Sequence, residues 1–541
     1  MNIVPKELLK DDLSRLNLLS LPVPQGLQTI EITVHRNHAF EPVASVLPVF
    51  LACSGLTARF HYSDYDDSLS FINMSFTFRS DAHLIWLDAA RYKQRDLSDW
   101  LEERLLALRA QDTAPVLVCC LGQNICLSKD TGCLVCDMQT MLGELGQAAE
   151  DRRLAPFSGT RLSNRACLEC ARWMGLRYLP SLFRPALKAL ALDCDNTLYD
   201  GVLAEDGTDG VTPYLAVQKY LQNLARQGFL LTLVSRNEEA DVRRLFERRR
   251  DFPLHWEDFA ATAINWQPKS DNIRFVADRL NIGLNAMVFV DDNWGELTQV
   301  GMTLPEVRLL AASSPEETLR GLRYCPLLWK PDVMMEDTLR NTDVQANQVR
   351  YRLQFACSSL EYRKQLDIHL TLTVNPVARI ARVTELLNKT NQFIFTFLRP
   401  SQESVMAFMS GKEKVCVACN VRDKLSDSGL VAIVLGLRST HEGSIGTMRV
   451  AELTVSCRAL GRGIETGLIF AMLRHACATL DCDRVCLSWR TGPRNAPGIA
   501  WLREYWPGVI GDTEALADVS KLTGHLEGVC IDPADPGDIE S

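Results

Sequence analysis

The chain has 541 residues, of which 47% are hydrophobic and 23% are charged, and its formal net charge is −9. This length predicts several domains, because single cores usually stop growing beyond about 250–300 residues. The composition is that of a globular protein and excludes global disorder and a small disulfide scaffold. The acidic balance argues against a general nucleic-acid binder, whose affinity comes mostly from neutralising phosphates.

The 18 cysteines are scattered, and many lie in apolar runs such as 118–121. This usage predicts buried thiols in a reducing, cytoplasmic compartment. The N-terminus carries acidic residues where a signal peptide would be apolar, and no window of 18 residues is apolar and uncharged, so we expect no membrane span.

The predicted elements alternate between strands and helices from the start of the chain. In residues 1–185, strands are expected at 29–34, 84–87 and 116–121 and a helix at 100–108. This alternation predicts an α/β domain. No arrangement of Ser, His and Asp in it indicates catalysis.

A second α/β domain is predicted for residues 186–325. An apolar strand ends at 192, a helix covers 217–224 and stops at Gly228, and a strand at 229–234 follows. A further helix is expected at 273–280 and a further strand at 287–290. The pattern predicts a doubly wound sheet whose strand ends collect the polar residues.

The remaining chain divides into a linking helix at 326–370, a third α/β domain at 371–530 and a flexible tail at 531–541. In the third domain, strands at 430–437 and 450–455 precede a glycine-rich turn and a long helix.

Two aspartates follow the first strand of the second domain. Asp193 and Asp195 are two residues apart, so in an extended strand their side chains share a face. Two carboxylates in the crevice beyond a sheet can hold Mg²⁺ through oxygen. One can also attack phosphorus while the other moves a proton.

Further polar groups follow in an order that suits phosphoryl transfer. Ser235 ends the next strand and offers a hydroxyl, Lys269 offers a cation, and Asp291 and Asp292 end another strand and complete a metal shell. Alone, an Asp-x-Asp pair such as Asp193 and Asp195 is more often a capped turn, and a lone lysine is more often solvated. Together, and at strand ends, they favour a site that positions and neutralises a phosphoryl group.

These segments resemble the four motifs of the haloacid dehalogenase (HAD) phosphatase superfamily. More closely, DCDNTLYDGVLAEDG (193–207), INWQPKSDNI (264–273) and VFVDDN (288–293) are similar to its FkbH-like branch. RYLPSLFRPALK, KTNQFIFT, SDSGLVAIV and CRALGRGIETGLI are also similar to that family, so the resemblance covers roughly residues 110–510. It implies a central HAD-like sheet, flanked by an SGNH-hydrolase-like N-terminal domain without hydrolytic function and a GNAT-like C-terminal domain.

The resemblance also implies roles for the residues of the second domain. Asp193 would be the nucleophile and a Mg²⁺ ligand, and Asp195 the acid and base that also reaches Mg²⁺ through its carbonyl. Thr197 would order the loop at the phosphate, Ser235 and Lys269 would bind the phosphoryl group, and Asp291, with Asp292, would hold the metal. One departure stands out, because the family usually has Trp-Gly-Gly where this chain has Tyr199-Asp200-Gly201.

The resemblance further implies a substrate and a partner. FkbH-like proteins are implicated in taking the glyceryl unit of 1,3-bisphosphoglycerate, removing phosphate, and loading the unit onto an acyl carrier protein through a cysteine thioester. Cys194 is the nearest candidate for that cysteine, although strand alternation places it on the opposite face and the adjacent carboxylates would raise its pKa. Cys457 is another candidate.

The glycine-rich turn of the third domain contains Arg458, Gly461, Arg462 and Gly463. A strand-to-helix turn of this kind suits an anion, and arginines add charged donors. The motif resembles the pyrophosphate loop of GNAT acetyltransferases, and we expect it to receive the phosphopantetheine arm of the carrier. Asn388, Asn391 and Asn495 are further polar residues that would line the groove. The alternative is a tight turn with solvated arginines.

Three CxxC pairs raise the alternative of zinc: Cys133/Cys136, Cys167/Cys170 and Cys416/Cys419. The first two pairs are farther apart than in a usual zinc ribbon, and two of the three lie in strand-like runs where the paired side chains diverge. Buried thiols are the preferred interpretation.

Three functions compete at this point. The first is an enzyme of polyketide-type metabolism that loads a carrier protein. The second is a phosphatase for a small phosphorylated metabolite, fused to a CoA-dependent N-acyltransferase. The third is a scaffold that binds a carrier protein without catalysis.

Overall fold

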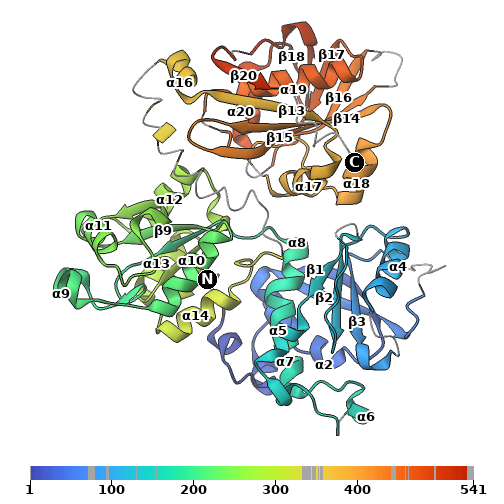
Figure 1. The fold of residues 1–541 in the computed structure, drawn as a ribbon, viewed down its shortest axis with the longest axis vertical. Coiled ribbons are helices and arrows are strands. Elements are labelled where there is room, and N and C mark those ends of the chain that lie inside the picture. The colour runs from blue at the N-terminus through green and yellow to red at the C-terminus, as the bar shows by residue number, and fades with distance from the viewer. Residues whose placement is uncertain are drawn as a thin grey trace. The chain divides into compact units, whose positions relative to one another are not determined.

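The computed structural model (Figure 1) describes residues 2–70, 79–92, 97–128, 131–153, 155–331, 343, 346, 349–350, 353, 358–390, 392–439, 446–456, 458–460, 462–492, 495–524 and 526–532. The chain divides into two compact units. The first comprises residues 1–224, 231–279 and 283–333, and the second comprises residues 334–541 with the short stretches 225–230 and 280–282.

The first unit begins with a five-stranded sheet whose strands are all parallel, in the order β2-β1-β3-β4-β5. Its strands are β1 (Gln28–Arg36), β2 (Leu56–Tyr65), β3 (Ala82–Asp88), β4 (Val116–Leu121) and β5 (Leu134–Cys136). The helices of this part are α1 (Arg15–Ser20), α2 (Glu41–Ala44), α3 (Leu47–Leu51), α4 (Ser98–Arg109), α5 (Met138–Gly143), α6 (Ala155–Ser158), α7 (Asn164–Trp173) and α8 (Leu179–Phe183).

Helices cover both faces of this sheet. Leu101 and Leu105 of α4 pack with Ile85 of β3 on one face, whereas α3 and α7 pack with Leu84 and Trp86 on the other. A parallel sheet buried on both sides needs strands that are apolar throughout, which explains the uninterrupted apolar run 116–121.

A second parallel sheet follows in the first unit, in the order β10-β9-β6-β11-β12. Its strands are β6 (Ala189–Leu192), β9 (Leu230–Ser235), β10 (Phe259–Ile264), β11 (Met287–Asp291) and β12 (Arg308–Ala311), and a small hairpin consists of β7 (Tyr199–Asp200) and β8 (Thr212–Pro213). The helices are α9 (Leu203–Gly210), α10 (Leu215–Arg226), α11 (Glu239–Arg248), α12 (Lys269–Leu280), α13 (Trp294–Thr303) and α14 (Pro315–Tyr324).

The predicted doubly wound sheet is confirmed by this strand order. The apolar spacing of Val217, Leu221 and Leu224 buries one side of α10. The helix gives way to β9 at Gly228, whose φ of 82° is a left-handed value that glycine adopts without strain.

The second unit contains an eight-stranded mixed sheet in the order β18-β19-β17-β16-β15-β14-β13-β20. Its strands are β13 (Ile368–Val374), β14 (Lys414–Arg422), β15 (Asp427–Arg438), β16 (Thr447–Val455), β17 (Arg484–Ser488), β18 (Val509–Ile510), β19 (Glu514–Asp518) and β20 (Val529–Asp532). The helices are α16 (Ser359–Leu366), α17 (Ile380–Lys389), α18 (Gln402–Met409), α19 (Glu465–Thr479) and α20 (Ala496–Tyr505).

The two faces of this sheet carry different helices (Figure 1). Val415 and Val417 of β14 join the core cluster of α19 and α20, whereas Cys416 and Ala418 join that of α17 and α18. The predicted mixed α/β class with several domains therefore holds for the whole described chain.

Some element boundaries differ from the prediction. The last strand, β20, pairs with β13 through Asp532, so the tail predicted from 531 begins inside a strand. Much of the linking helix predicted for 326–370 and the end of the tail lie outside the described residues, and α16 is the helix that the structure describes there. Across the described part of the chain, no helix combines the length and apolar character that crossing a membrane requires.

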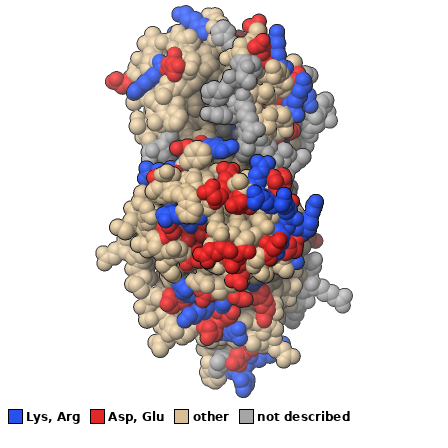
Figure 2. All heavy atoms as spheres, turned by 90° about the vertical axis from the view of Figure 1, so that its left-hand side faces the viewer, with Lys and Arg blue, Asp and Glu red and all other residues tan. Residues whose placement is uncertain are grey.

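Figure 2 shows one face of the molecule, on which acidic side chains gather across the middle of the view with basic side chains beside them. The mixture agrees with the moderate acidic excess of the sequence.

Candidate active site

The candidate site lies where the winding of the second parallel sheet reverses. Strands β6 and β11 are neighbours at this point, and each ends in an aspartate, Asp193 after β6 and Asp291 at the end of β11. The backbone N–H of Asp193 donates to the carbonyl of Val290 at 3.0 Å, which holds the two strand ends together. Ligands of doubly wound sheets bind in the crevice at such a reversal.

Lys269, the first residue of α12, joins the two aspartates. Its Nζ lies 3.0 Å from Oδ1 of Asp193 and 2.6 Å from Oδ2 of Asp291, and only 4% of the residue is exposed. Burial alone would lower the pKa of Lys269, but the carboxylates of Asp193 and Asp291 outweigh it and raise this pKa to about 12. The lysine is therefore a permanent cation of the site.

Three carboxylates converge around this cation. Asp193, Asp291 and Asp292 each offer an oxygen within 4.8 Å of the other two. Burial, followed by the charge of Asp193, raises the pKa of Asp291 to about 7 and raises that of Asp292 in the same direction. One lysine thus leaves the carboxylates short of positive charge, and their hard oxygen atoms suit Mg²⁺.

Asp195 belongs to a different part of the site. Its Oδ1 accepts from the hydroxyl of Tyr199 at 2.7 Å and from the N–H of Leu203 at 3.1 Å, and its Oδ2 accepts from Nδ2 of Asn237 at 3.0 Å. Its carboxylate is not in the metal cluster of the described residues. Strand alternation predicted that Asp193 and Asp195 share one face of a strand. This expectation is corrected here, because β6 ends at Leu192 and both aspartates lie in the loop that follows.

Asn237 is a site residue that the sequence reasoning missed. Its buried amide also donates to Oγ of Ser235 at 3.2 Å, so it links the end of β9 to Asp195. Its only sequence signal is its place two residues after the end of an apolar strand.

Thr197 and Cys194 lie in the same loop as Asp193 and Asp195, between β6 and β7. The Thr197 hydroxyl is buried and has no hydrogen-bond partner in the described part of the chain. Cys194 is fully buried, and its pKa is raised well above the usual value, first by burial and then by Asp193, while a hydrogen bond with Ser235 opposes this. The predicted direction of the shift is right, but burial rather than the carboxylates is its main cause, and both disfavour a thiolate.

At Tyr199-Asp200-Gly201, where the chain departs from the Trp-Gly-Gly of the FkbH-like resemblance, the side chains of Tyr199 and Asp200 each make a hydrogen bond. Tyr199 is fully buried and places its hydroxyl on Asp195. Asp200 is exposed and hydrogen-bonds to Tyr214. The extra carboxylate therefore has a hydrogen-bond partner of its own in Tyr214.

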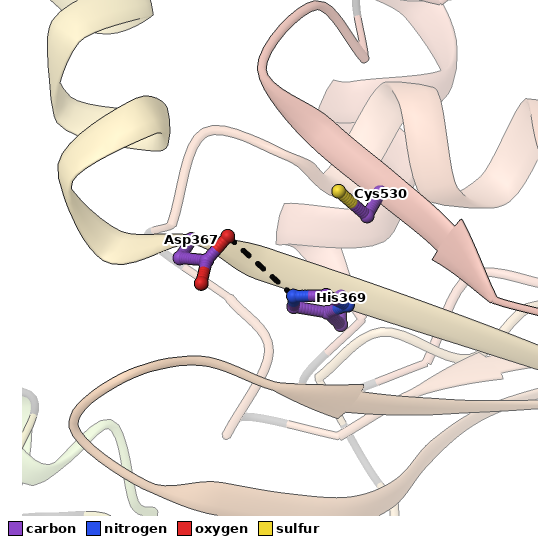
Figure 3. Close-up of side chains that lie close together, drawn as sticks. All are labelled: Asp367, His369 and Cys530. Atoms are coloured by element: carbon purple, nitrogen blue, oxygen red, sulfur yellow. Dashed lines mark ion pairs between the residues drawn. The ribbon is translucent and has the colours of Figure 1, made fainter.

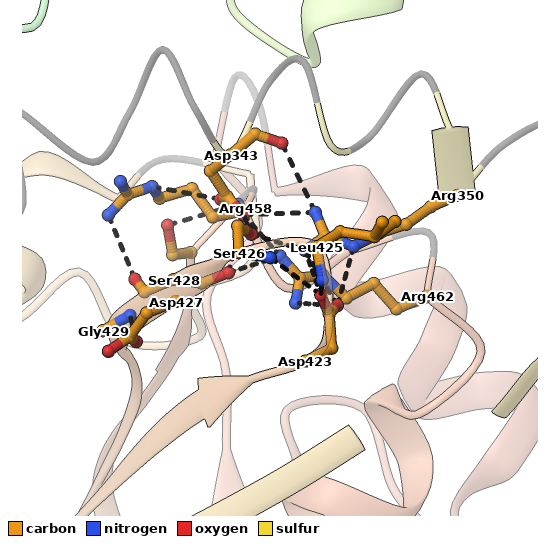
Figure 4. Close-up of polar contacts among 11 residues, drawn as sticks. Asp343, Arg350, Asp423, Leu425, Ser426, Asp427, Ser428, Gly429, Arg458 and Arg462 are labelled. Carbon is orange, nitrogen blue, oxygen red and sulfur yellow. Dashed lines mark hydrogen bonds and ion pairs between the residues drawn. The ribbon is translucent and has the colours of Figure 1, made fainter. Parts of the chain in front are cut away.

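The glycine-rich turn of the second unit differs from the prediction. Arg462 is 1% exposed, and its guanidinium reaches Asp343 at 2.9 Å and Asp423 at 3.4 Å. Arg458 is also buried and lies 3.4 Å from Asp343. Figure 4 shows both arginines turned toward these carboxylates.

The same network includes Arg350, which contacts Asp343 and Asp423. Ser426 and Ser428 donate to Asp343 at 2.6 and 2.7 Å. The role expected of Arg458 and Arg462 toward a pantetheine phosphate stays a prediction, and in this structure both guanidiniums face internal carboxylates. Their partners lie far away along the chain and gave no local signal.

Gly463 has the left-handed φ of 68° expected of a tight turn before α19, whereas Gly461 and Cys457 lie outside the described residues. Asn388 donates to the carbonyls of Thr384 and Pro400, and Asn495 donates to two other carbonyls of the backbone. The groove role of these amides stays a prediction, and Asn391 lies outside the described residues.

The cysteines of the three CxxC pairs are free thiols. None of them belongs to a metal-competent group of the described residues. Burial raises the pKa of Cys416 to about 12, as expected of an inert core thiol. Five of these six cysteines are buried, as the preferred interpretation expects, whereas Cys133 is partly exposed.

Neither a protein-family model nor a curated protein matches the chain. Among solved structures, the chain is similar to the N-terminal part of BF1531 from Bacteroides fragilis, which contains a phosphatase domain and is complexed with Mg. The two are 18% identical over 60% of this chain and 99% of that one, with a TM-score of 0.46. The aminoglycoside acetyltransferase AAC(6')-Ib, in complex with coenzyme A, is 14% identical over 28% of this chain and 94% of its own, with a TM-score of 0.21. A variant of the spermidine N-acetyltransferase SpeG from Vibrio cholerae is 13% identical over 28% of this chain and 95% of its own, with a TM-score of 0.22.

Proposed function

We propose that the first unit is a HAD-type phosphatase that takes the phosphoryl group of a small phosphorylated substrate onto Asp193. The observation that carries this proposal is the buried group of Asp193, Lys269, Asp291 and Asp292 at the carboxyl ends of β6 and β11. It combines a nucleophile, a fixed cation and a surplus of oxygen ligands in one place.

The residues divide the work of phosphoryl transfer. A carboxylate oxygen of Asp193 forms a bond to phosphorus while the bond from phosphorus to the leaving oxygen breaks, and Asp195 gives that oxygen its proton. A water then attacks the phosphoaspartate, Asp195 accepts its proton, and phosphate leaves with Asp193 restored. Lys269 and Ser235 neutralise and orient the phosphoryl oxygens.

Asp193, Asp291 and Asp292 would hold Mg²⁺, and we propose that the backbone carbonyl of Asp195 also contributes. When bound, Mg²⁺ supplies positive charge against the phosphoryl oxygens. Thr197 keeps the role of ordering the loop in this proposal, and its buried hydroxyl, which has no hydrogen-bond partner among the described residues, is free to do so.

Three hydrogen bonds fit Asp195 to its role. Tyr199, Asn237 and the N–H of Leu203 fix both carboxylate oxygens, so the group is oriented before the substrate arrives. A proton-transfer group must lie within hydrogen-bonding reach of the atom it serves, and fixed orientation favours this.

The experiment is phosphate release from a panel of acyl phosphates and phosphate esters, with and without Mg²⁺. Asp193→Asn should abolish turnover, and Asp209→Asn, an exposed aspartate of α9, should leave it unchanged. Phosphate release that is equal in both variants, and independent of Mg²⁺, would contradict the proposal.

We further propose, on the FkbH-like resemblance, that the substrate is 1,3-bisphosphoglycerate or a similar acyl phosphate. A cysteine thiolate would attack the acyl carbon and displace the 1-phosphate, and Asp193 would take the phosphoryl group from the 3-position. The thiol of the phosphopantetheine arm of an acyl carrier protein would then attack the thioester and release the cysteine thiol, in polyketide-type metabolism. Cys194 is given no nucleophilic role, because burial and its raised pKa oppose a thiolate. The free cysteines of the described chain suit a reducing, cytoplasmic compartment.

Carrier loading has its own test. A purified carrier protein is mixed with the enzyme, Mg²⁺ and 1,3-bisphosphoglycerate, and its mass is measured. A mass gain equal to one glyceryl unit supports loading, whereas phosphate release without any gain would leave the phosphatase and remove this substrate and partner.

A further inference from the structure

Three residues with different metal-binding atoms meet at the edge of the second-unit sheet. They are Asp367, His369 and Cys530, which offer an oxygen, a nitrogen and a sulfur within 4.8 Å of one another. Figure 3 shows them around one small space beside β13 and β20. They lie far from any CxxC pair in the sequence.

The backbone explains why these side chains meet. Asp367 caps the C-terminus of α16 with a left-handed φ of 52°, and β13 begins at the next residue. Strands β13 and β20 are parallel, and His369 is directly opposite Cys530 in their register. Side chains opposite each other on neighbouring strands share a face, so the imidazole and the thiol are held side by side.

A fourth residue orients the imidazole. Nδ1 of His369 lies 3.0 Å from Oδ2 of Asp532, whereas Nε2 lies 3.5 Å from Oδ1 of Asp367, which is long for a hydrogen bond. Ligand histidines in metal sites usually donate their other ring N–H to a carboxylate, which fixes the ring and its tautomer. Asp532 therefore has the position of an orienting group, and Nε2 faces the other two donors.

The charges of the group balance around a divalent ion. Asp367 and a Cys530 thiolate would supply two negative charges, and Asp532 is compensated separately by Arg422 at 3.2 Å. Sulfur and imidazole nitrogen select zinc over Mg²⁺ or Ca²⁺, which prefer oxygen alone.

We propose that Asp367, His369 and Cys530 bind a zinc ion that fastens β20 to β13, with the fourth position of the ion open to water. Both Asp367 and Cys530 are exposed, so the ion can enter from solvent. Strand β20 has four residues and lies at the edge of the sheet, where its own pairing is short. The site is independent of the phosphatase proposed for the first unit.

The test uses the full chain, stripped of metal and kept reduced, with Co²⁺ as the probe. Saturating Mg²⁺ is present so that the carboxylates of the first unit do not take up the probe. We expect one Co²⁺ per chain to produce a thiolate-to-cobalt charge-transfer band, and zinc to displace it.

Two variants and one control define the site. Cys530→Ser should remove the band, and Cys126→Ser, an exposed cysteine of the first unit, should keep it. Asp532→Asn should weaken cobalt binding by about 10–100-fold, as expected for a group that orients a ligand. No band in the unsubstituted chain, or a band that survives Cys530→Ser, would overturn the proposal.

The fastening role is measured separately by hydrogen exchange. Zinc should slow exchange in peptides from β13 and β20, and Cys530→Ser should remove this slowing. Zinc binding that leaves exchange in β20 unchanged would overturn the fastening role.

Discussion

Replacing Lys269 by Met tests the charge balance of the proposed active site. The lysine is nearly fully buried and makes ion pairs with Asp193 at 3.0 Å and Asp291 at 2.6 Å. Lys269→Met would leave these carboxylates buried without a cation. Removing one partner of a buried ion pair costs about 3–5 kcal/mol, so we expect the metal-free first unit to lose that much stability.

The measurement is hydrogen exchange in peptides from β6 and β11, which reports this unit alone. Lys6→Met is the matched control, because Lys6 also pairs with a carboxylate, that of Glu317 at 3.3 Å, but about half of each side chain is exposed. An exposed pair contributes about 0–1 kcal/mol. Mg²⁺ should restore part of the loss in Lys269→Met and none in Lys6→Met. Equal, small losses in the two variants would refute the reasoning.

Three further predictions concern Tyr199, Asp291 and Asp343. Tyr199→Phe removes a hydrogen-bond donor from Asp195. Phosphate release should slow by about tenfold, the effect of roughly one hydrogen bond to a charged group, and the pH–rate profile should shift. An unchanged pH–rate profile would contradict the role given to Asp195. Burial raises the pKa of Asp291 from 3.8 to about 7. Between these two pH values the folded, metal-free protein binds more protons than the unfolded chain. Its free energy of unfolding should therefore fall as pH rises from about 4 to about 7. Mg²⁺, which competes with protons for the carboxylate, should stabilise the protein increasingly over the same range in thermal unfolding. Asp343→Asn leaves Arg458 and Arg462 facing a neutral amide and should cost the second unit about 3–5 kcal/mol by hydrogen exchange in α19, whereas a change below 1 kcal/mol would contradict the network.

The convergence of Asp193 and Asp291 could be predicted from the sequence because it depends on strand ends, whereas Lys269 begins a helix and was assigned to the site by the order of the motifs along the chain. Parallel strands of one sheet end at the same edge, and an apolar run followed by a carboxylate marks such an end without any knowledge of the register. The parallel sheets themselves followed from the same runs, since strands buried on both faces are apolar throughout.

The arrangement within the loops could not be predicted in the same way. Strand alternation fails for Asp195 because β6 has already ended, and the φ of 51° at Asn196 turns the chain instead. Asn237 has no pattern of its own, since one amide after a strand is common. The role of Arg462 depended on Asp343, which lies 119 residues away and meets it only in the folded unit.

Two buried charged clusters of the described residues illustrate how charge balance separates a site from a scaffold. In the second unit, Asp343 and Asp423 face Arg350, Arg458 and Arg462, and serines supply the remaining hydrogen bonds to Asp343. In this network three arginines face two carboxylates, so the described residues leave no negative charge for a further cation to balance, although Oδ2 of Asp343 accepts no hydrogen bond from them.

In the buried cluster of the first unit, negative charges outnumber positive ones. Among the described residues, Asp193, Asp291 and Asp292 share a single lysine, and burial, followed by the charge of Asp193, raises the pKa values of Asp291 and Asp292. A fold keeps such a deficit only where a proton or a metal ion completes it. The cation deficit, more than the identity of any one aspartate, therefore supports the proposal that Mg²⁺ and a phosphoryl group bind at the ends of β6 and β11.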